Sequence, residues 1–121
     1  MSLEENFETA KYFYENGFYQ QSKESFFNIL KKRPLDFDFL QGYTFSLMQL
    51  KEYEKAIIAF EILSFLKKED AYIHFYKGQC YFSLDKIKEG ISSLNESLKN
   101  NQDEYLKEKI KILIKQNSEK L

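Results

Sequence analysis

Apolar side chains recur along the chain at steps of three and four residues, the spacing of one face of an α-helix. The clearest stretch runs from Phe39 to Leu63 and carries two such patterns separated by a short break. Residues 49–52 of the break can form only a turn that folds two helices antiparallel. The same arrangement occurs once before and once after, which predicts three helical pairs. Their helices are expected at 3–15 and 19–32, 37–49 and 53–67, and 71–83 and 87–99.

The three pairs repeat with a period of 34 residues, because five columns keep their character at that spacing. The columns of small residues are Ala10, Thr44 and Gly78, and Ser22, Ala56 and Gly90. The columns of large apolar residues are Phe13, Leu47 and Tyr81, then Phe26, Phe60 and Leu94, and finally Tyr19, Tyr53 and Ile87. A 34-residue helix–turn–helix unit is the signature of the tetratricopeptide repeat. The sequence therefore predicts an all-α fold in one domain, 1–121, with repeats at 3–34, 37–68 and 71–102 stacked as a short superhelix.

Residues at the expected helix ends support these boundaries. Gly17 suits the left-handed position after a helix, and Pro34 stops the second helix. Acidic residues that can cap the helices after them are Asp36, Asp70 and Asp103. The helix expected at 103–116 lacks the repeat pattern, as does a terminal helix that covers the edge of a repeat array. Residues 117–121 are expected to fray.

Composition and charge exclude several classes of partner. The net charge is −1 with 31% charged residues and no evident basic face, so we expect no nucleic-acid partner. The apolar runs are too short for a membrane span, and the acidic N-terminus lacks the layout of a signal peptide. We therefore expect a cytoplasmic protein.

Nothing in the sequence indicates catalysis, a metal or a cofactor. The only histidine and cysteine, His74 and Cys80, lie six residues apart on one expected helix and so face different sides. Both are interpreted as packing residues. The four glycines are isolated, which argues against a phosphate-binding loop.

The aromatic content of 17% exceeds what a core of this size needs, so some rings are expected to serve a surface. In the tetratricopeptide family, the first helix of each pair lines a concave face that binds ligands. The repeat positions that line this face include Glu4 and Asp38, and the candidates for ligand contact among them are Phe7, Lys11, Tyr14, Gln41, Phe45, Met48, Tyr72, Phe75, Gln79 and Phe82. We interpret them as a groove for an extended peptide with apolar side chains. The alternative is that the superhelix is too short to expose them, or that the last helix or a second copy of the chain buries them. Since only Lys11 is cationic, a clamp for acidic peptide termini is not expected.

Four stretches resemble a more specific family within the tetratricopeptide group. They are Leu3-Glu4 with Gly17-Phe18-Tyr19, Asp36 with Phe39-Leu40-Gln41-Gly42, Tyr53-Glu54-Lys55-Ala56-Ile57 with Phe60, and Phe75 with Gly78-Gln79-Cys80. Through them, residues 3–116 resemble the class II chaperones of bacterial type III secretion, which hold hydrophobic translocator proteins. The resemblance implies that a client segment lies extended in the groove, with Phe7, Tyr14, Tyr43 and Phe45 among its contacts. It also leaves a homodimer open.

The sequence thus predicts a non-enzymatic chaperone that keeps an apolar secreted client from aggregating. The alternative is a general repeat adaptor that scaffolds an assembly, with its aromatic residues buried in a homo-oligomer. Whether the last helix caps the array or fills part of the groove is left open.

Overall fold

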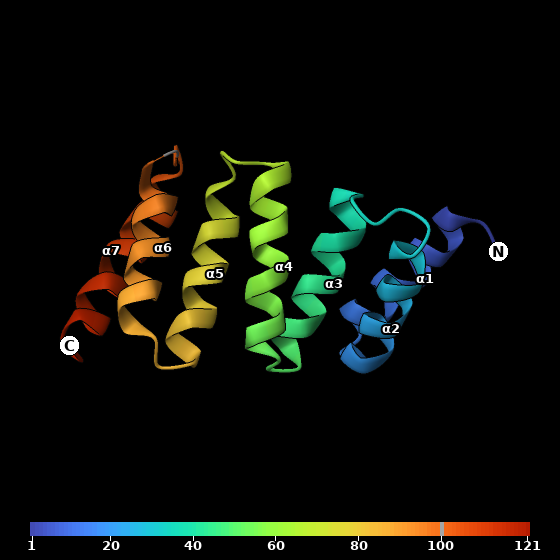
Figure 1. The fold of residues 1–121 in the computed structure, drawn as a ribbon, viewed down its shortest axis with the longest axis horizontal. Helices are drawn as coiled ribbons and strands as arrows, with labels where there is room; N and C mark the ends of the chain where they lie inside the picture. The colour runs from blue at the N-terminus through green and yellow to red at the C-terminus, as the bar shows by residue number, and fades with distance from the viewer. Residues whose placement is uncertain (100) are drawn as a thin grey trace. The chain divides into compact units, whose positions relative to one another are not determined.

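The computed structural model describes residues 1–99 and 101–121, all in helices or short connections. Residue 100 of the predicted third repeat lies outside the described residues. The helices are α1 (Leu3–Glu15), α2 (Tyr19–Leu30), α3 (Phe37–Gln49), α4 (Tyr53–Leu66), α5 (Ala71–Ser83), α6 (Ile87–Lys99) and α7 (Glu104–Ser118) (Figure 1). Each predicted helix is present with ends within two residues of the prediction. The all-α fold of three helical pairs and a terminal helix is confirmed.

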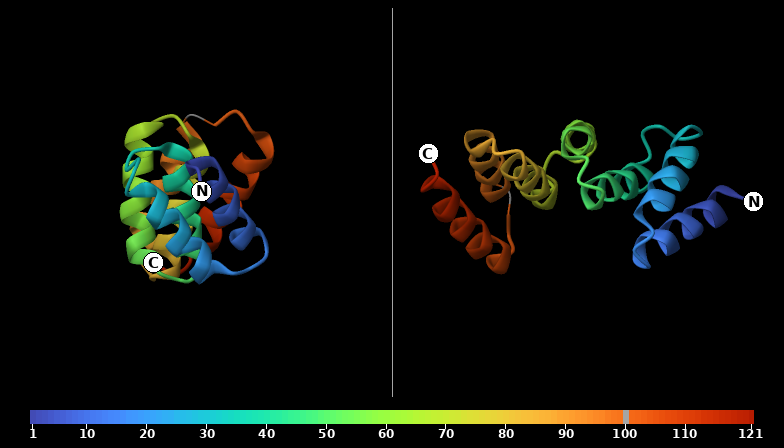
Figure 2. Two further views of the ribbon diagram at one scale, coloured as in Figure 1. Left: turned by 90° about the vertical axis from the view of Figure 1, so that its right-hand side faces the viewer. Right: turned by 90° about the horizontal axis from the view of Figure 1, so that it is seen from below.

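The chain forms two compact units, residues 1–59 and 60–121, whose boundary falls inside α4. In the first unit, α2 packs against both α1 and α3. In the second unit, α5 and α6 run antiparallel side by side, and α7 packs against α6 (Figures 1 and 2).

The repeat columns account for the interior of both units. The column Phe26, Phe60 and Leu94 is buried throughout, as expected of large apolar residues on the inner face of each second helix. The small residues of the column Ser22, Ala56 and Gly90 are buried as well. Small side chains there allow helices to approach closely while large ones fill the neighbouring space.

The turn inside each helical pair has the same backbone geometry. Gly17, Lys51 and Asp85 have φ angles of 81°, 61° and 62°, in the left-handed region, and lie 34 residues apart. After α1, the amide of Gly17 donates to the carbonyl of Tyr14 and that of Phe18 to Phe13, the bond pair of a Schellman motif. The same two bonds recur after α3 and α5. A glycine stands at this position only in the first repeat.

Side-chain caps begin several helices as expected. Asp36, Asp70 and Asp103 accept hydrogen bonds from the amides of Phe39, Tyr72 and Tyr105, respectively. At the other end of α7 the expectation of fraying was wrong for Asn117 and Ser118. The helix continues to Ser118, because Asn117 is buried and its amide nitrogen donates to the carbonyl of Leu113 at 2.8 Å.

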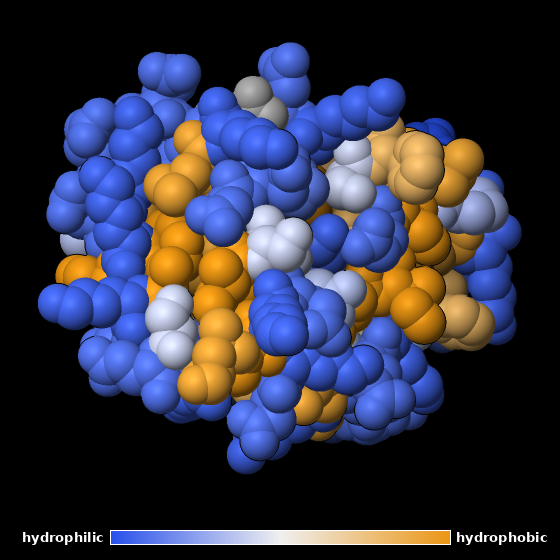
Figure 3. Space-filling model, turned by 60° about the vertical axis from the view of Figure 1, so that its left-hand side comes forward, coloured by the Kyte–Doolittle hydropathy of each residue, from blue (hydrophilic) through white to orange (hydrophobic). Residues whose placement is uncertain are grey.

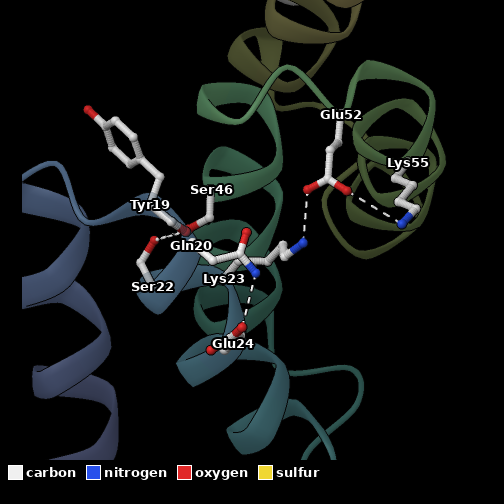
Figure 4. A network of polar contacts seen from close by, with 8 residues as sticks. All are labelled: Tyr19, Gln20, Ser22, Lys23, Glu24, Ser46, Glu52 and Lys55. Carbon is white, nitrogen blue, oxygen red and sulfur yellow. Dashed lines mark hydrogen bonds and ion pairs between the residues drawn. The ribbon is translucent and has the colours of Figure 1, made fainter.

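Two polar links cross between helices of the first unit (Figure 4). The hydroxyls of Ser22 on α2 and Ser46 on α3 lie 2.7 Å apart and are fully buried. Lys23 Nζ lies 3.0 Å from Glu52 Oε2, in the turn before α4, and Lys55 approaches the other oxygen of that carboxylate at 3.4 Å. Together these contacts connect α2 with α3 and with the start of α4.

Candidate peptide-binding site

The clearest candidate site is a pocket of about 310 Å³ in the first unit. Its lining comes from α1, α2 and α3. The lining residues are Phe7, Lys11, Tyr14, Glu15, Phe26, Asp38, Gln41, Gly42 and Phe45. Five predicted groove residues thus meet at one pocket: Phe7, Lys11, Tyr14, Gln41 and Phe45.

The floor of the pocket is aromatic. The Phe7 ring packs edge-on against Phe26 at 6.0 Å and tilted against Phe39 at 5.1 Å, between ring centroids. Gly42 completes the floor, since a β-carbon at that position would overlap the Phe26 ring. Because Gly42 has no side chain, the Phe26 ring can lie directly against the backbone of α3 at the base of the pocket.

The rim of the pocket carries opposite charges. Lys11 is cationic, whereas Glu15 and Asp38 are anionic, and Gln41 adds an amide. Lys11 Nζ lies 4.5 Å from the Phe7 ring centroid and 2.7 Å from Glu8 Oε1, so this cation already has an anionic and an aromatic partner. The rim therefore suits an apolar group flanked by hydrogen-bond donors or a cation better than an acidic ligand.

Tyr14 is fixed at the edge of the pocket by two neighbours. Its hydroxyl accepts a hydrogen bond from Gln49 Nε2 at 3.4 Å, and its ring packs edge-on against Tyr19 at 5.4 Å. The contact with the Tyr19 ring restricts the Tyr14 side chain before any ligand arrives, which lowers the entropy cost of binding.

Two other predicted groove residues of the first unit do not line this pocket. Tyr43 packs against Phe27 of α2, with ring centroids 5.9 Å apart. Met48 is half-buried near the end of α3. Successive residues of a helix point about 100° apart, so Tyr43 could not share a face with Gln41 and Phe45.

In the second unit, α7 covers predicted groove residues. Phe75 is only 3% exposed and belongs to a core cluster with Ala71, Leu94, Leu106 and Ile110. Its expected place on an open groove was therefore wrong. The cause is the apolar side of α7. The sequence shows that this side exists but not which helix it packs against. Within this unit, the terminal helix packs over Phe75 rather than leaving it open.

Three further predicted groove residues lie in this unit: Phe82, Tyr72 and Gln79. Each is partly buried or contacts a neighbouring side chain. Phe82 packs on the same cluster, so close to Gly90 that a β-carbon there would overlap the ring. The Tyr72 hydroxyl donates to Asp103 Oδ2 at 2.6 Å, which raises the pKa of Tyr72 and lowers that of the carboxyl. Gln79 is half-buried.

Asp38 lines the pocket at a groove position that the repeat pattern predicted, whereas three other pocket residues were not predicted: Glu15, Phe26 and Gly42. Glu15 follows the candidate Lys11 by four residues, so helical spacing could have found it. Phe26 could not be found in this way. Its position in a column of large apolar residues predicts burial, and nothing in the sequence indicates that its ring also borders the pocket.

His74 and Cys80 are packing residues, as predicted. Cys80 is fully buried, and burial raises the pKa of its thiol to about 12. His74 is partly buried, which lowers its pKa, and Lys77 lowers it further. In the described parts of the chain, no three His, Cys, Asp or Glu side chains come together in a way that could hold a metal ion. Among the described helices, none has the length and apolar composition needed to cross a bilayer.

Comparison with known proteins identifies the fold. No protein-family model matches the sequence, and no curated protein sequence matches it significantly. Solved structures match closely. The chaperone SycD of Yersinia enterocolitica, in complex with a peptide of the translocator YopD, has a TM-score of 0.89 at 16% identity, over 98% of this chain and 93% of SycD.

Two more structures share the architecture. PcrH of Pseudomonas aeruginosa, bound to the chaperone-binding region of PopD, has a TM-score of 0.87 at 14% identity, over 98% of this chain and 92% of PcrH. The first tetratricopeptide domain of Spaghetti (RPAP3), bound to an HSP90 peptide, has a TM-score of 0.84 at 13% identity, covering 97% of this chain and 90% of that one. The chain therefore has the tetratricopeptide fold of the translocator chaperones.

Proposed function

We propose that this protein is a non-enzymatic, cytoplasmic peptide-binding chaperone that holds an apolar segment of a secreted client protein. The observation that carries the proposal is the pocket in the first unit, with an aromatic floor and a polar rim. An apolar side chain placed over Gly42 would be shielded from water by Phe7, Phe26 and Phe45.

The fold supports the same function. Both SycD and PcrH have been solved with segments of the translocators that they bind. The RPAP3 domain binds an acidic HSP90 peptide on a similar fold, so the fold alone does not choose the ligand. The side chains of the pocket do. Two carboxylates and one lysine at the rim disfavour an acidic peptide, and the rings of Phe7, Phe26 and Phe45 favour an apolar side chain.

The second candidate function is a repeat adaptor in a protein assembly. Its support is in the second unit, where α7 buries Phe75 and where Tyr72 is bonded to the cap of α7. Those contacts support a structural role for the two rings. An adaptor would bind through surface outside the pocket, so substitutions in the pocket separate the two functions.

The test is a selection of 12-residue peptides displayed on phage against the wild-type protein. The best peptide is then labelled with a fluorophore, and its affinity is measured by anisotropy. We expect enriched peptides to carry apolar residues, and Phe45→Glu to weaken binding at least tenfold, because it places a charge at the apolar wall. Tyr105→Glu on exposed α7 is the matched control and should bind like the wild type.

Circular dichroism melts of both variants separate loss of binding from loss of fold. Phe7 is a poorer test position, because its ring packs against Phe26 and Phe39 and its replacement would disturb the core. Enrichment of no peptide, or full affinity in a folded Phe45→Glu variant, would refute the chaperone proposal and favour the adaptor.

A further inference from the structure

The candidate pocket of the first unit has an acidic rim that is only partly neutralised within the fold. Exposed apolar surface on this protein is bordered by hydrophilic side chains, as the face drawn in Figure 3 shows. At the pocket, the charged neighbours are mostly anionic. Together with Glu8, which binds Lys11, the pocket region carries three carboxylates and one ammonium group, those of Glu8, Glu15, Asp38 and Lys11.

Glu15 and Asp38 are the carboxylates at the pocket without a cationic partner. Both are exposed, and neither forms an ion pair within the described parts of the chain. Asp38 lies in the first turn of α3, where the helix dipole favours an anion. Glu15 is the last residue of α1, where the dipole disfavours one. Helix stability therefore does not account for Glu15, and both charges are available to a ligand.

These two carboxylates lie at opposite ends of the pocket. The helices α1 and α3 run in the same direction, because each packs against α2 and is joined to it by a short connection. The repeat places Glu15 level with Gln49 of α3, and Asp38 lies at the other end of that helix. At the α-helical rise per residue, the two ends are about 16 Å apart along the helix axes. The rings of Phe7 and Phe45 line the pocket between them.

An extended peptide matches this layout with a simple pattern. Side chains at alternate positions of an extended segment point to the same side, and the first and fifth residues are about 13 Å apart. When the third side chain enters the pocket, the first and fifth therefore point toward its two ends. The long side chain of a lysine or arginine can reach across the remaining few ångströms.

We infer that the pocket binds a segment with an apolar side chain in the middle and a lysine or arginine two residues away on each side, paired with Glu15 and Asp38. This inference rests on the proposed peptide-binding function and names the class of segment that the site selects. The apolar side chain supplies the shielded contact with the rings. The two ion pairs fix the register of the segment and reject acidic neighbours, which is the usual contribution of charges at the rim of an interface.

The test is the phage selection at low ionic strength, carried out in parallel on the wild type and on the double variant Glu15→Lys with Asp38→Lys. The wild type is expected to enrich apolar residues that have lysine or arginine two positions away on both sides. The double variant should enrich the same apolar residues with aspartate or glutamate at those positions. Circular dichroism confirms that the variant is folded.

The matched control is the double variant Glu54→Lys with Glu119→Lys, which changes the net charge by the same amount outside the pocket lining. Glu54 lies in the first turn of α4, and Glu119 directly follows α7, so both helix positions resemble those of the test pair. This control should select peptides like the wild type. It separates contacts at the rim from the effect of total charge.

Single reversals test the two ends of the pocket separately. Asp38→Lys should invert the charge preference on one side of the apolar residue, and Glu15→Lys on the other side, which also gives the direction of the bound segment. Anisotropy with a wild-type-selected peptide should show about threefold weaker binding for each single variant and about tenfold for both, as expected of exposed ion pairs. These differences should shrink as salt is added.

Three outcomes would overturn the inference and leave the proposed function in place: enriched apolar residues without basic neighbours, a basic preference that survives in the folded double variant, and single reversals that act on the same side. Enrichment of no peptide by the wild type would instead refute the proposed function, and this inference with it.

Discussion

The ring of Phe26 on α2 lies against the backbone of Gly42 on α3, with no room for a β-carbon between them. Phe82 and Gly90 repeat this relationship between α5 and α6. In both units a glycine lets an aromatic ring approach the neighbouring helix. In the first unit the same contact also forms the floor of the candidate pocket.

Gly42→Ala is expected to destabilise the protein by about 1–3 kcal/mol, the usual cost of overpacking a core. Phe26 is only 2% exposed, so its ring cannot turn away into solvent. Urea denaturation measures the effect, with Gln41→Ala on the same helix as the control. Adding Phe26→Leu to Gly42→Ala should recover part of the lost stability, because a leucine is smaller than the ring. The third repeat already has a leucine, Leu94, at this position. A Gly42→Ala variant as stable as the Gln41→Ala control would contradict the observed contact.

Lys51→Gly is expected to stabilise the fold by about 0.5 kcal/mol. A residue other than glycine in the left-handed conformation costs about 1–2 kcal/mol, which the substitution removes. Part of this gain in stability is lost again, because glycine has more backbone freedom in the unfolded chain. Asp85→Gly should gain less, because aspartate tolerates this conformation better. Thermal and urea unfolding test both variants. Gly17→Ala is the opposite change at the matching position and should destabilise, so a stable Gly17→Ala variant would speak against the shared turn geometry.

Glu52→Gln should lower stability at neutral pH by less than about 1 kcal/mol, the range of partly exposed ion pairs. The hydrogen bond from Lys23 lowers the pKa of Glu52 below its usual value near 4.5, against a smaller opposing effect of burial. A lowered pKa in the folded state stabilises the protein above the unfolded pKa, and this contribution disappears as the pH falls through the folded pKa.

The difference between the wild type and Glu52→Gln should therefore be present at pH 7 and shrink at pH 3, as measured by urea denaturation at both. Glu24→Gln is the control, since Glu24 accepts a hydrogen bond from Gln20 at the exposed surface. A difference of equal size at both pH values would mean that the ionised form of Glu52 has no role.

Tyr72→Phe should loosen the start of α7. It removes the hydroxyl that donates to Asp103, the residue that caps α7 through the amides of Tyr105 and Leu106. We expect a lower melting temperature and faster hydrogen exchange of amides in the first turn of α7. Tyr105→Phe serves as the control, because Tyr105 is highly exposed. Unchanged exchange in Tyr72→Phe would mean that the aspartate holds the cap without help from α5.

The repeat pattern predicted the helices well because periodic burial determines them locally. Small and large residues at a spacing of 34 could occupy those positions only if the pairs stack, and columns such as Phe26 and Phe60 are buried accordingly. The site was predicted less completely. Lys11 and Gln41 line the pocket as predicted, because they lie on the expected faces of α1 and α3. Phe75 did not remain open, since the position of α7 depends on packing between distant residues that no local pattern records.

The single thiol of Cys80 is enclosed and hard to ionise. Only the thiolate reacts rapidly with alkylating or disulfide reagents, so Cys80 of the native molecule should react with them very slowly. Each labelling event then requires that the helices around α5 first come apart. Cys80 can therefore serve as a probe of transient opening without any substitution. The rate at which iodoacetamide labels it reports how often this unit unfolds.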